Sequence, residues 1–364
     1  MSRISVIRTL ALAVLVLFAA PAAAAPRYLG IQVHALWSTE THADMLRDVE
    51  HLADLGVNVA RTDVGWSSLQ GGGPGRFESW YVDKLDAFVA AADARGIKVI
   101  ATLTETPCWA STAPARLKQG CSGSWWERNV QDYPPADPRD YGRAAKFLTD
   151  RYGPKLAALE IWNEPNLSYE FIGPRAKKAA RYAALVRATY PLAKQGDPRV
   201  PVLAGATAYA DVSFLRRLYA AGIRGSYDGI SIHPYSDGRG PASEAAPARL
   251  EFGPGIRSIR AAQLAAGQAK PLWLTEFGFT ACRWCGSLEQ QATLIADTTR
   301  AIPQFAFVRG ATLYQLRDTE TAPDSWENNF GLLRQSYEAR PAYAAFRSAV
   351  AAVRAQWRRA ARSR

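Results

Sequence analysis

Short apolar runs alternate with longer, more polar segments along the whole chain. The polar segments carry apolar residues three and four positions apart, which is the spacing of one helix face. The apolar runs are short and rich in β-branched residues, which favours buried strands. They cover residues 28–36, 57–66, 98–107, 156–164, 200–208, 228–235, 271–279 and 310–317.

Several helix ends can also be placed from single residues. The helical segment that begins at Trp80 should stop before Gly96, because glycine is typical of the position after a helix. Asp137 followed by Pro138 predicts an N-cap and a first helical residue. The last helix is expected over residues 341–357.

Eight strands, each followed by a helix, predict the α/β class and a single-domain (β/α)8 TIM barrel over residues 26–357, with a basic C-terminal tail at 358–364. A doubly wound open sheet is the alternative. That fold would carry a glycine-rich phosphate turn after its first strand, where Gly30 stands alone. The glycine-rich run 71–75 lacks the Lys-Ser/Thr of a phosphate loop, so the pattern favours the barrel.

Residues 1–25 have the features of a signal peptide. Arg3 and Arg8 precede an apolar run at 9–20, and small residues follow at 21–25. A retained membrane anchor is the alternative, but the run is shorter than the roughly 18 residues that an anchor needs. We therefore expect export to the periplasm or the medium, with no membrane span after cleavage.

The chain contains four cysteines, which allow three pairings. In an exported protein they are expected to form disulfides, and Cys108 with Cys121 would close a long loop. Cys282 and Cys285 could instead form a redox or zinc motif. A zinc site would need a second cysteine pair of similar spacing, so the disulfide interpretation is favoured.

The formal net charge of +11 favours an acidic partner, such as an anionic polysaccharide, a lipid surface or a nucleic acid. No nucleic-acid-binding motif accompanies the arginines, so no nucleic-acid partner is expected. The arginines are spread over predicted helix faces, apart from a cluster in the C-terminal tail. A solvated basic surface explains most of the charge, and an acidic substrate is the weaker interpretation.

Ionisable residues gather where the predicted strands end, which is where barrel enzymes carry their catalytic groups. Glu164 ends the fourth strand and Glu276 lies near the end of the seventh, across the barrel mouth. Two such carboxyl groups suit glycoside hydrolysis with retention, one as acid/base and one as nucleophile. Arg61 and Tyr235 are expected to keep Glu276 charged. The alternative is that both glutamates form structural ion pairs with arginines at the rim.

Three motifs in these strands resemble the retaining glycoside hydrolases of clan A. They are Trp-Asn-Glu-Pro-Asn at 162–166, Thr-Glu-Phe-Gly at 275–278 and His-Pro-Tyr at 233–235. The resemblance implies that Glu164 is the acid/base and Glu276 the nucleophile. It also implies that Asn163 binds the sugar 2-hydroxyl, that Tyr235 contacts the nucleophile, and that Arg61 and His233 belong to the site.

Segments 30–34, 61–66 and 314–318 look most like family 39, which includes β-xylosidases and the endoglycosidases of exopolysaccharide loci. Cellulase-like family 5 is a near relative. The chain is too short for the additional β-domain of family 39 xylosidases. Many members of the clan place a tryptophan on the last strand, where this chain has Tyr314, with Trp326 following in the loop.

Aromatic and polar residues after the strand ends are candidates for sugar contacts, since aromatic rings stack on sugar faces. Substrate binding is expected from His34, Trp37, Trp66, Tyr314 and Trp326. The long connection 108–136, with Trp109, Trp125, Trp126 and Tyr133, should form one wall of the cleft, and Trp284 belongs to the same group.

Four further carboxylates lie in or just after the predicted strands. Glu105 and Asp63 either bind sugar hydroxyls or form rim ion pairs, and Asp318 fits either role. Glu160 is expected to be a buried partner of an arginine.

The sequence thus predicts a monomeric hydrolase that cleaves β-glycosidic bonds of a polysaccharide or oligosaccharide. Endo-cleavage is favoured, with a bacterial exopolysaccharide as one candidate substrate. No cofactor is expected, and no metal, because no two of the four histidines have metal-binding spacing. An exo-acting β-xylosidase or related trimming enzyme is the alternative. A barrel that binds polysaccharide without cutting it would be expected to lack one of the two glutamates.

Overall fold

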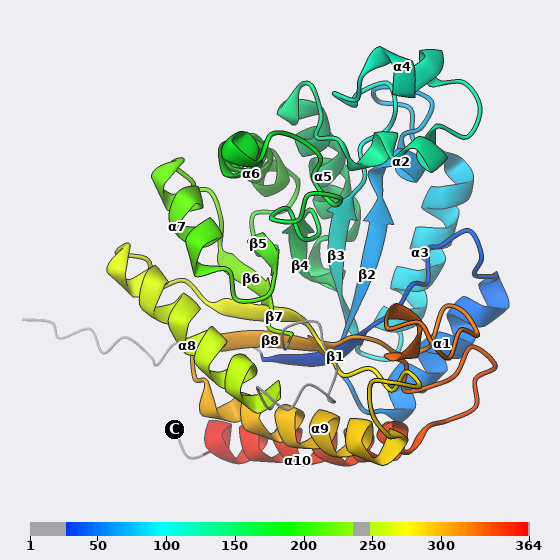
Figure 1. Ribbon diagram of the computed structural model, residues 1–364, viewed down its shortest axis with the longest axis vertical. Helices are drawn as coiled ribbons and strands as arrows, with labels where there is room; N and C mark the ends of the chain where they lie inside the picture. Colours follow the sequence, from blue (N-terminus) through cyan, green and yellow to red (C-terminus); the bar gives the residue numbers. More distant parts are fainter. Residues whose placement is uncertain (1–26, 236–247, 363–364) are drawn as a thin grey trace, which may run out of the picture.

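The computed structural model describes residues 27–235 and 248–362. In this part of the chain eight parallel strands form a closed barrel in the order in which they occur in the sequence (Figure 1). They are β1 Tyr28–Gln32, β2 Val59–Gly65, β3 Lys98–Thr104, β4 Leu156–Ile161, β5 Val202–Ala208, β6 Gly229–His233, β7 Leu272–Phe277 and β8 Val308–Leu313. The predicted (β/α)8 barrel is confirmed. Each strand begins within two residues of its predicted start.

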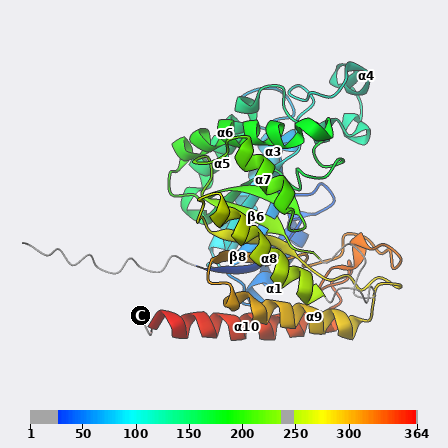
Figure 2. The ribbon, with the colours of Figure 1, turned by 60° about the vertical axis from the view of Figure 1, so that its left-hand side comes forward.

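One long helix follows each strand and packs on the outside of the barrel (Figures 1 and 2). These helices are α1 His42–Asp54, α3 Ser79–Asp93, α5 Pro138–Tyr152, α6 Lys178–Gly196, α7 Val212–Ala220, α8 Ala248–Ala265, α9 Leu288–Ala301 and α10 Pro341–Arg362. The short helices α2 Trp66–Leu69 and α4 Ala115–Lys118 lie in the connections after β2 and β3.

The structure confirms the helix ends that were predicted from capping residues. The Asp137 side chain accepts a hydrogen bond from the Arg139 amide, and Pro138 is the first residue of α5. Helix α3 ends just before Gly96, which has a φ of +68°. The last helix, expected to end at Trp357, continues to Arg362.

The barrel interior is built in layers, because side chains two residues apart on a strand point to the same face. An apolar layer lies at the base of the barrel, which is the end where the strands begin. It contains Val59, Ile100, Ala158, Leu203 and Trp273. Two residues further along four of these strands, the side chains are polar. They are Arg61, Thr102, Glu160 and Thr275, and all are buried. The apolar layer therefore closes the base, and the polar layer forms the floor of the opposite end.

Both expected disulfides are present, Cys108–Cys121 and Cys282–Cys285. The first closes part of the long connection between β3 and α5, where Cys108, Ala113 and Val130 form a small core of their own. Within the described residues, no helix combines the length and apolar character needed to span a bilayer. The expected signal peptide, residues 1–25, lies outside the described part.

Candidate active site

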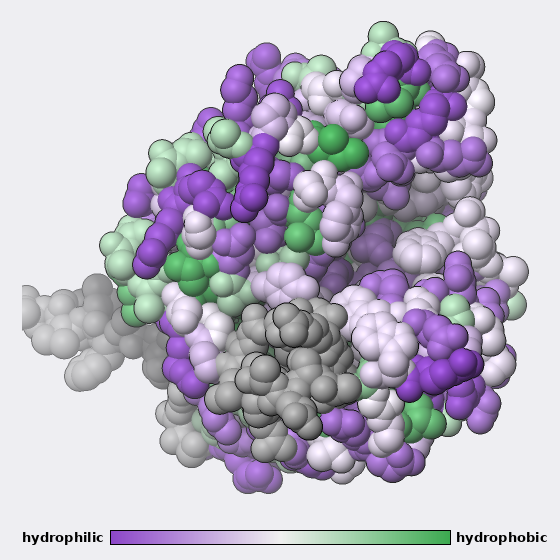
Figure 3. All heavy atoms as spheres, in the orientation of Figure 1, coloured by the Kyte–Doolittle hydropathy of each residue, from purple (hydrophilic) through white to green (hydrophobic). Residues whose placement is uncertain are grey.

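A cleft of about 590 Å³ opens where the strands end, above the polar layer. Figure 3 shows the surface hollowed here, with hydrophilic side chains in the recess. Seven carboxyl groups line the cleft, and its described lining contains no lysine or arginine. The seven are Asp63, Glu105, Asp132, Glu164, Glu170, Glu276 and Glu327.

Glu164 and Glu276 face one another across this cleft. One carboxylate oxygen of each, together with a ring nitrogen of His233, lies within 4.8 Å of the others. Carboxyl pairs in retaining glycosidases are about 5–5.5 Å apart, whereas inverting pairs are about 6.5–9.5 Å apart. The separation therefore fits direct attack on the sugar by one carboxylate better than the wider spacing of an inverting pair.

The backbone after β4 turns sharply to present Glu164. Trp162 has a φ of +65° and Glu164 a φ of +41°, a region that non-glycine residues seldom adopt. The conformation is held in place because the Trp162 amide donates to the Leu103 carbonyl and the Glu164 amide donates to the Ala206 carbonyl. Unusual backbone of this kind costs on the order of 1–3 kcal/mol per residue and concentrates at functional sites.

The Arg61 guanidinium is the centre of the buried polar layer. It donates to Glu276 at 2.6 Å, to Glu160 at 2.8 Å and to the Asn163 side-chain oxygen at 3.0 Å. A fully buried cation between two carboxylates offsets part of the cost of burying them. Arg61 thereby fixes the positions of a predicted nucleophile and of a predicted sugar-binding amide at the same time.

Burial raises the pKa values of both glutamates above those of ordinary surface carboxyl groups. It raises the pKa of Glu164 to about 8, because the attraction of Arg61 is too weak to compensate. Burial also raises the pKa of Glu276, while His233, Arg61 and the Tyr235 hydroxyl, which donates at 2.8 Å, oppose the rise. Glu164 is therefore the better proton donor near neutral pH, and Glu276 is the better stabilised anion.

His233 lies between the two glutamates, with its Nδ1 2.8 Å from Glu164 and 3.5 Å from Glu276. Burial lowers the pKa of His233, which favours the neutral imidazole. These three residues form the single cluster with metal-ligand geometry among the described residues. A divalent cation bound there would be repelled by Arg61, which already contacts Glu276.

Most of the expected site residues line the cleft. They are His34, Trp37, Asn163, Glu164, Tyr235, Glu276, Tyr314 and Trp326. The His34 ring packs on Trp37, with centroids 4.0 Å apart, and its Nδ1 lies 2.9 Å from Asp63. Asp63 and Glu105 also reach the cleft, so the sugar-contact interpretation of these two residues fits better than rim ion pairs.

Three of the expected site residues lie beneath the surface of the cleft. Trp66 is fully buried, and its indole donates to the Gln70 side chain at 2.7 Å. Arg61 and His233 are likewise fully buried and contact the glutamates. Arg61 and His233 are positioned to act through the glutamates, and Trp66 packs the core.

The aromatic residues of the β3–α5 connection do not line the cleft described above. The Trp109 indole donates to the Gln70 carbonyl, and Trp125 and Tyr133 pack on the small core of this connection. Trp126 is exposed but does not line the cleft. The connection contributes the Asp132 carboxylate instead.

Among the cleft residues that the sequence did not indicate, four lie in the connections after the strands. Asp132 follows β3, Tyr169 and Glu170 follow β4, and Glu327 follows β8. Burial and the nearby Glu164 raise the pKa of Glu170 to about 8, and burial and Glu105 raise the pKa of Asp132 to about 7. No periodic pattern or motif marks these positions.

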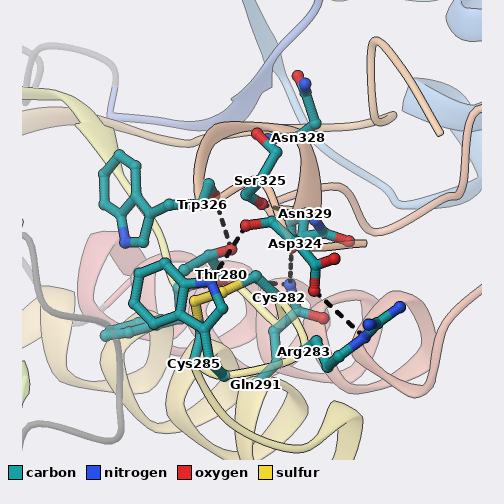
Figure 4. Close-up of a disulfide and its surroundings, with 12 residues drawn as sticks. Thr280, Cys282, Arg283, Cys285, Gln291, Asp324, Ser325, Trp326, Asn328 and Asn329 are labelled. Atoms are coloured by element: carbon teal, nitrogen blue, oxygen red, sulfur yellow. Dashed lines mark hydrogen bonds and ion pairs between the residues drawn. A yellow bond between two sulfur atoms is a disulfide. The ribbon is translucent and has the colours of Figure 1, made fainter. Parts of the chain in front are cut away.

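The Cys282–Cys285 disulfide braces the segment that carries Trp326 and Glu327 (Figure 4). Next to it, the Trp284 indole donates to the Asp324 carbonyl at 3.1 Å, and the Thr280 hydroxyl donates to the Trp326 carbonyl at 2.8 Å. Trp284 is 56 % exposed and lies outside the cleft lining, so it supports this wall from behind.

Two carboxylates are structural. Glu160 pairs with Arg61, as expected, and is fully buried. Asp318, for which the sequence allowed either role, forms a buried ion pair with Arg340 at 2.6 Å and accepts from the Gly331 amide. It thus holds the end of the β8 connection against the start of α10.

Comparisons with known proteins agree with this geometry. The sequence profile described as cellulase (glycosyl hydrolase family 5) matches residues 22–300, which include both glutamates. No curated protein matches the chain.

Solved structures with the same fold include members of both families suggested by the motifs. A family 39 glycoside hydrolase from Bacteroides cellulosilyticus WH2 aligns with a TM-score of 0.68 and 21 % identity, over 89 % of this chain and 63 % of its own length. A β-xylosidase from Caulobacter crescentus CB15 gives 0.66 and 21 %, over 88 % of this chain and 67 % of its own. A GH5_18 protein from Streptomyces cattleya in complex with GlcNAc gives 0.68 and 20 %, over 89 % and 80 %.

The chain therefore spans less than two thirds of the Bacteroides enzyme. Together with the barrel and the opposed glutamates, the profile match over most of the sequence identifies the family. The chain belongs to glycoside hydrolase family 5, within the clan A enzymes that hydrolyse O-glycosidic bonds with retention.

Proposed function

We propose that the protein cleaves internal β-glycosidic bonds of an uncharged polysaccharide, with Glu276 as nucleophile and Glu164 as acid/base. The observation that carries the assignment is the separation of the two carboxylates, within 4.8 Å, inside a cleft. Glu276 attacks the anomeric carbon while Glu164 protonates the leaving oxygen. Glu164 then deprotonates the water that hydrolyses the glycosyl-enzyme ester.

The charge of the cleft supports a substrate without anionic groups. Seven carboxyl groups and no described lysine or arginine line it, so a uronate or a sulfated sugar would find no basic side chain to pair with on the cleft surface. Carboxyl groups bind neutral sugar hydroxyls as hydrogen-bond acceptors, and as donors when protonated. The basic net charge of the chain is therefore a poor guide to its substrate.

The distribution of aromatic residues supports endo-cleavage. Trp37 from the β1 connection and Tyr169 from the β4 connection are 41 % and 64 % exposed and line the same cleft. Their connections follow different strands around the mouth. Two exposed rings of this kind can hold sugar units beyond the one being cleaved, which an enzyme that trims single terminal sugars does not require.

Product sizing tests the mode of cleavage. Neutral plant and bacterial β-linked polysaccharides are first screened for released reducing ends, and the best substrate is digested for increasing times. Endo-cleavage predicts an early ladder of oligosaccharides and a rapid fall in viscosity. Monosaccharide alone from the earliest time would instead support the exo-acting, β-xylosidase-like alternative. The identity of the sugar unit is not needed for this test, since only product length is read.

The pH dependence tests the role of Glu164. Its pKa of about 8 predicts that kcat/KM falls above pH 8, because only the protonated acid can assist departure of the leaving group. An aryl glycoside whose phenol leaves without protonation should lose this basic limb in the glycosylation step, whereas an alkyl glycoside should keep it. Equal limbs for the two substrates would contradict the assignment of Glu164 as the acid.

The proposal also includes export from the cytoplasm. It is supported by the signal-like composition of residues 1–25 and by two disulfides, which persist in oxidising compartments.

A further inference from the structure

Positive charge collects at the end of the barrel opposite the cleft. This end, here called the base, comprises the starts of the strands and the C-terminal end of α10 (Figure 2). The Arg27 guanidinium lies 5.8 Å from the centre of the Trp357 ring, which places the last turns of α10 beside the start of β1. Arg354 donates to the Gly56 carbonyl, in the turn that leads into β2.

The base carries more cations than its carboxylates neutralise. Asp228 is paired with Lys194 at 2.6 Å, and Asp197 with Arg199 at 2.8 Å. Among the described residues, Arg27, Arg354, Arg358 and Arg362 have no carboxylate within ion-pair distance. Burial and, second to it, the positive charge of Arg27 both lower the pKa of Arg309, so like charges lie close together here.

Three of these arginines form a line along α10. Arg354, Arg358 and Arg362 are four residues apart, so they share one face of the helix. Trp357, between the first two in sequence, packs its ring against the core and under Arg27, so it supports this face from behind. A helix face with several arginines in a row is typical of segments that bind anionic lipid headgroups.

An apolar hollow of about 440 Å³ adjoins the arginines in the centre of the base. Leu156, Val200, Pro201, Pro271 and Trp273 contribute to its lining. Arg199, Arg309 and Asp228 also line it, and Asp228 is paired with Lys194, so the hollow combines apolar walls with a surplus of positive charge. A hollow of this composition suits a molecule with an anionic group and a hydrocarbon part, whereas a soluble polyanion would use the arginines alone.

We propose that the base docks on an anionic lipid bilayer and leaves the cleft facing away from it. The charges favour this orientation, because the base presents arginines without carboxylate partners while the described lining of the cleft contains no lysine or arginine. The arginines of the base thus account for part of the net charge of +11, independently of the substrate. This inference does not depend on the proposed substrate or on the roles of the two glutamates.

Vesicle co-sedimentation of the full chain tests the proposal. Vesicles of phosphatidylcholine mixed with phosphatidylglycerol are compared with pure phosphatidylcholine, at low and at high salt. The base variant is R354Q/R358Q/R362Q. The matched control R116Q/R139Q/R175Q removes the same charge from exposed positions in connections or helix starts on the cleft side.

The wild type and the control should bind the anionic vesicles with similar affinity, and salt should weaken both. The base variant should bind at least about tenfold more weakly, since each basic residue near the surface adds measurable affinity. The variant R354K/R358K/R362K keeps the charge and should bind like the wild type. Thermal unfolding of all variants checks that α10 remains folded.

Three results would overturn the inference. Equal losses in the base and control variants would mean that net charge alone drives binding. Equal binding of all variants to neutral vesicles, or no binding to either vesicle, would exclude a docking role for the arginines. Tighter arginine-dependent binding to soluble alginate than to vesicles would identify a polyanion as the partner in place of a bilayer.

Discussion

Replacing Glu276 with glutamine is expected to lower kcat by about 10⁵-fold, the order of loss found when a catalytic nucleophile is removed. The glutamine amide has nearly the same shape and can still occupy the position between Arg61 and Tyr235. It cannot attack the anomeric carbon. Substrate affinity, measured by calorimetry with an oligosaccharide, should change by less than about tenfold, because ground-state contacts remain.

Glu327 provides a matched control for this substitution. It also lines the cleft and accepts a hydrogen bond from a tyrosine, Tyr314, at 2.6 Å. Arg61 donates to Glu276 and not to Glu327, so replacing Glu327 by glutamine removes at most a sugar contact worth about 1 kcal/mol, or less than about tenfold in kcat/KM. If the E276Q and E327Q variants lost activity equally, or if E276Q kept a tenth of kcat, Glu276 would not be the nucleophile.

The barrel could be predicted well, because the order of its strands and helices follows from the spacing of apolar residues along the chain. Strand positions followed from short β-branched runs, and the start of α5 followed from the chemistry of Asp137 and Pro138. The predicted ranges ran past the observed strand ends by up to four residues. In β4 the reason is the bend at Trp162 and Glu164, whose positive φ angles no apolar pattern reveals.

The opposed glutamates could be located for a similar reason. Their positions follow from the order of strands around a closed barrel, and the motifs around them identified the clan. Aromatic residues could not be assigned in this way, because the path of a connection decides whether a ring is exposed. Trp66 and Trp37 both follow strands, yet Trp66 is fully buried while Trp37 is 41 % exposed.

The acidic character of the cleft could not be predicted either, because it depends on the paths of several connections. Asp132, Glu170 and Glu327 come from three connections that meet only in the folded chain. The net charge pointed the opposite way, because cations dominate the surface while carboxylates line the cleft. Only the folded structure places arginines at the base of the barrel and carboxyl groups in the cleft at the opposite end.

We expect two buried carboxylates, Glu160 and Glu105, to contribute to stability with opposite signs. Glu160 should stabilise the fold, and its effect should be the larger of the two. Replacing Glu160 with glutamine should lower the free energy of unfolding by about 3–5 kcal/mol at pH 7, the usual cost of removing one partner of a buried ion pair. Glu160 is fully buried and accepts from Arg61 and from the Thr102 hydroxyl, each at 2.8 Å. Its loss leaves the Arg61 cation with less compensation in the centre of the barrel.

Glu105 offers a control of opposite sign. It accepts from the Ser67 hydroxyl, has no ion-pair partner among the described residues, and burial raises its pKa. A neutral glutamine should therefore leave stability at pH 7 unchanged or slightly higher. Urea unfolding at several pH values separates the two cases.

The direction of each pKa shift fixes the pH dependence of these differences. The ion pair with Arg61 holds the pKa of Glu160 below its ordinary value despite burial, so its stabilisation is present above the unfolded pKa and is lost as pH falls through the folded one. The deficit of the E160Q variant should accordingly shrink in acid. The pKa of Glu105 is raised, so the wild type loses stability relative to the E105Q variant as pH rises towards neutral. Equal deficits for both variants at all pH values would mean that burial alone, and not the contact with Arg61, decides the contribution of each carboxylate.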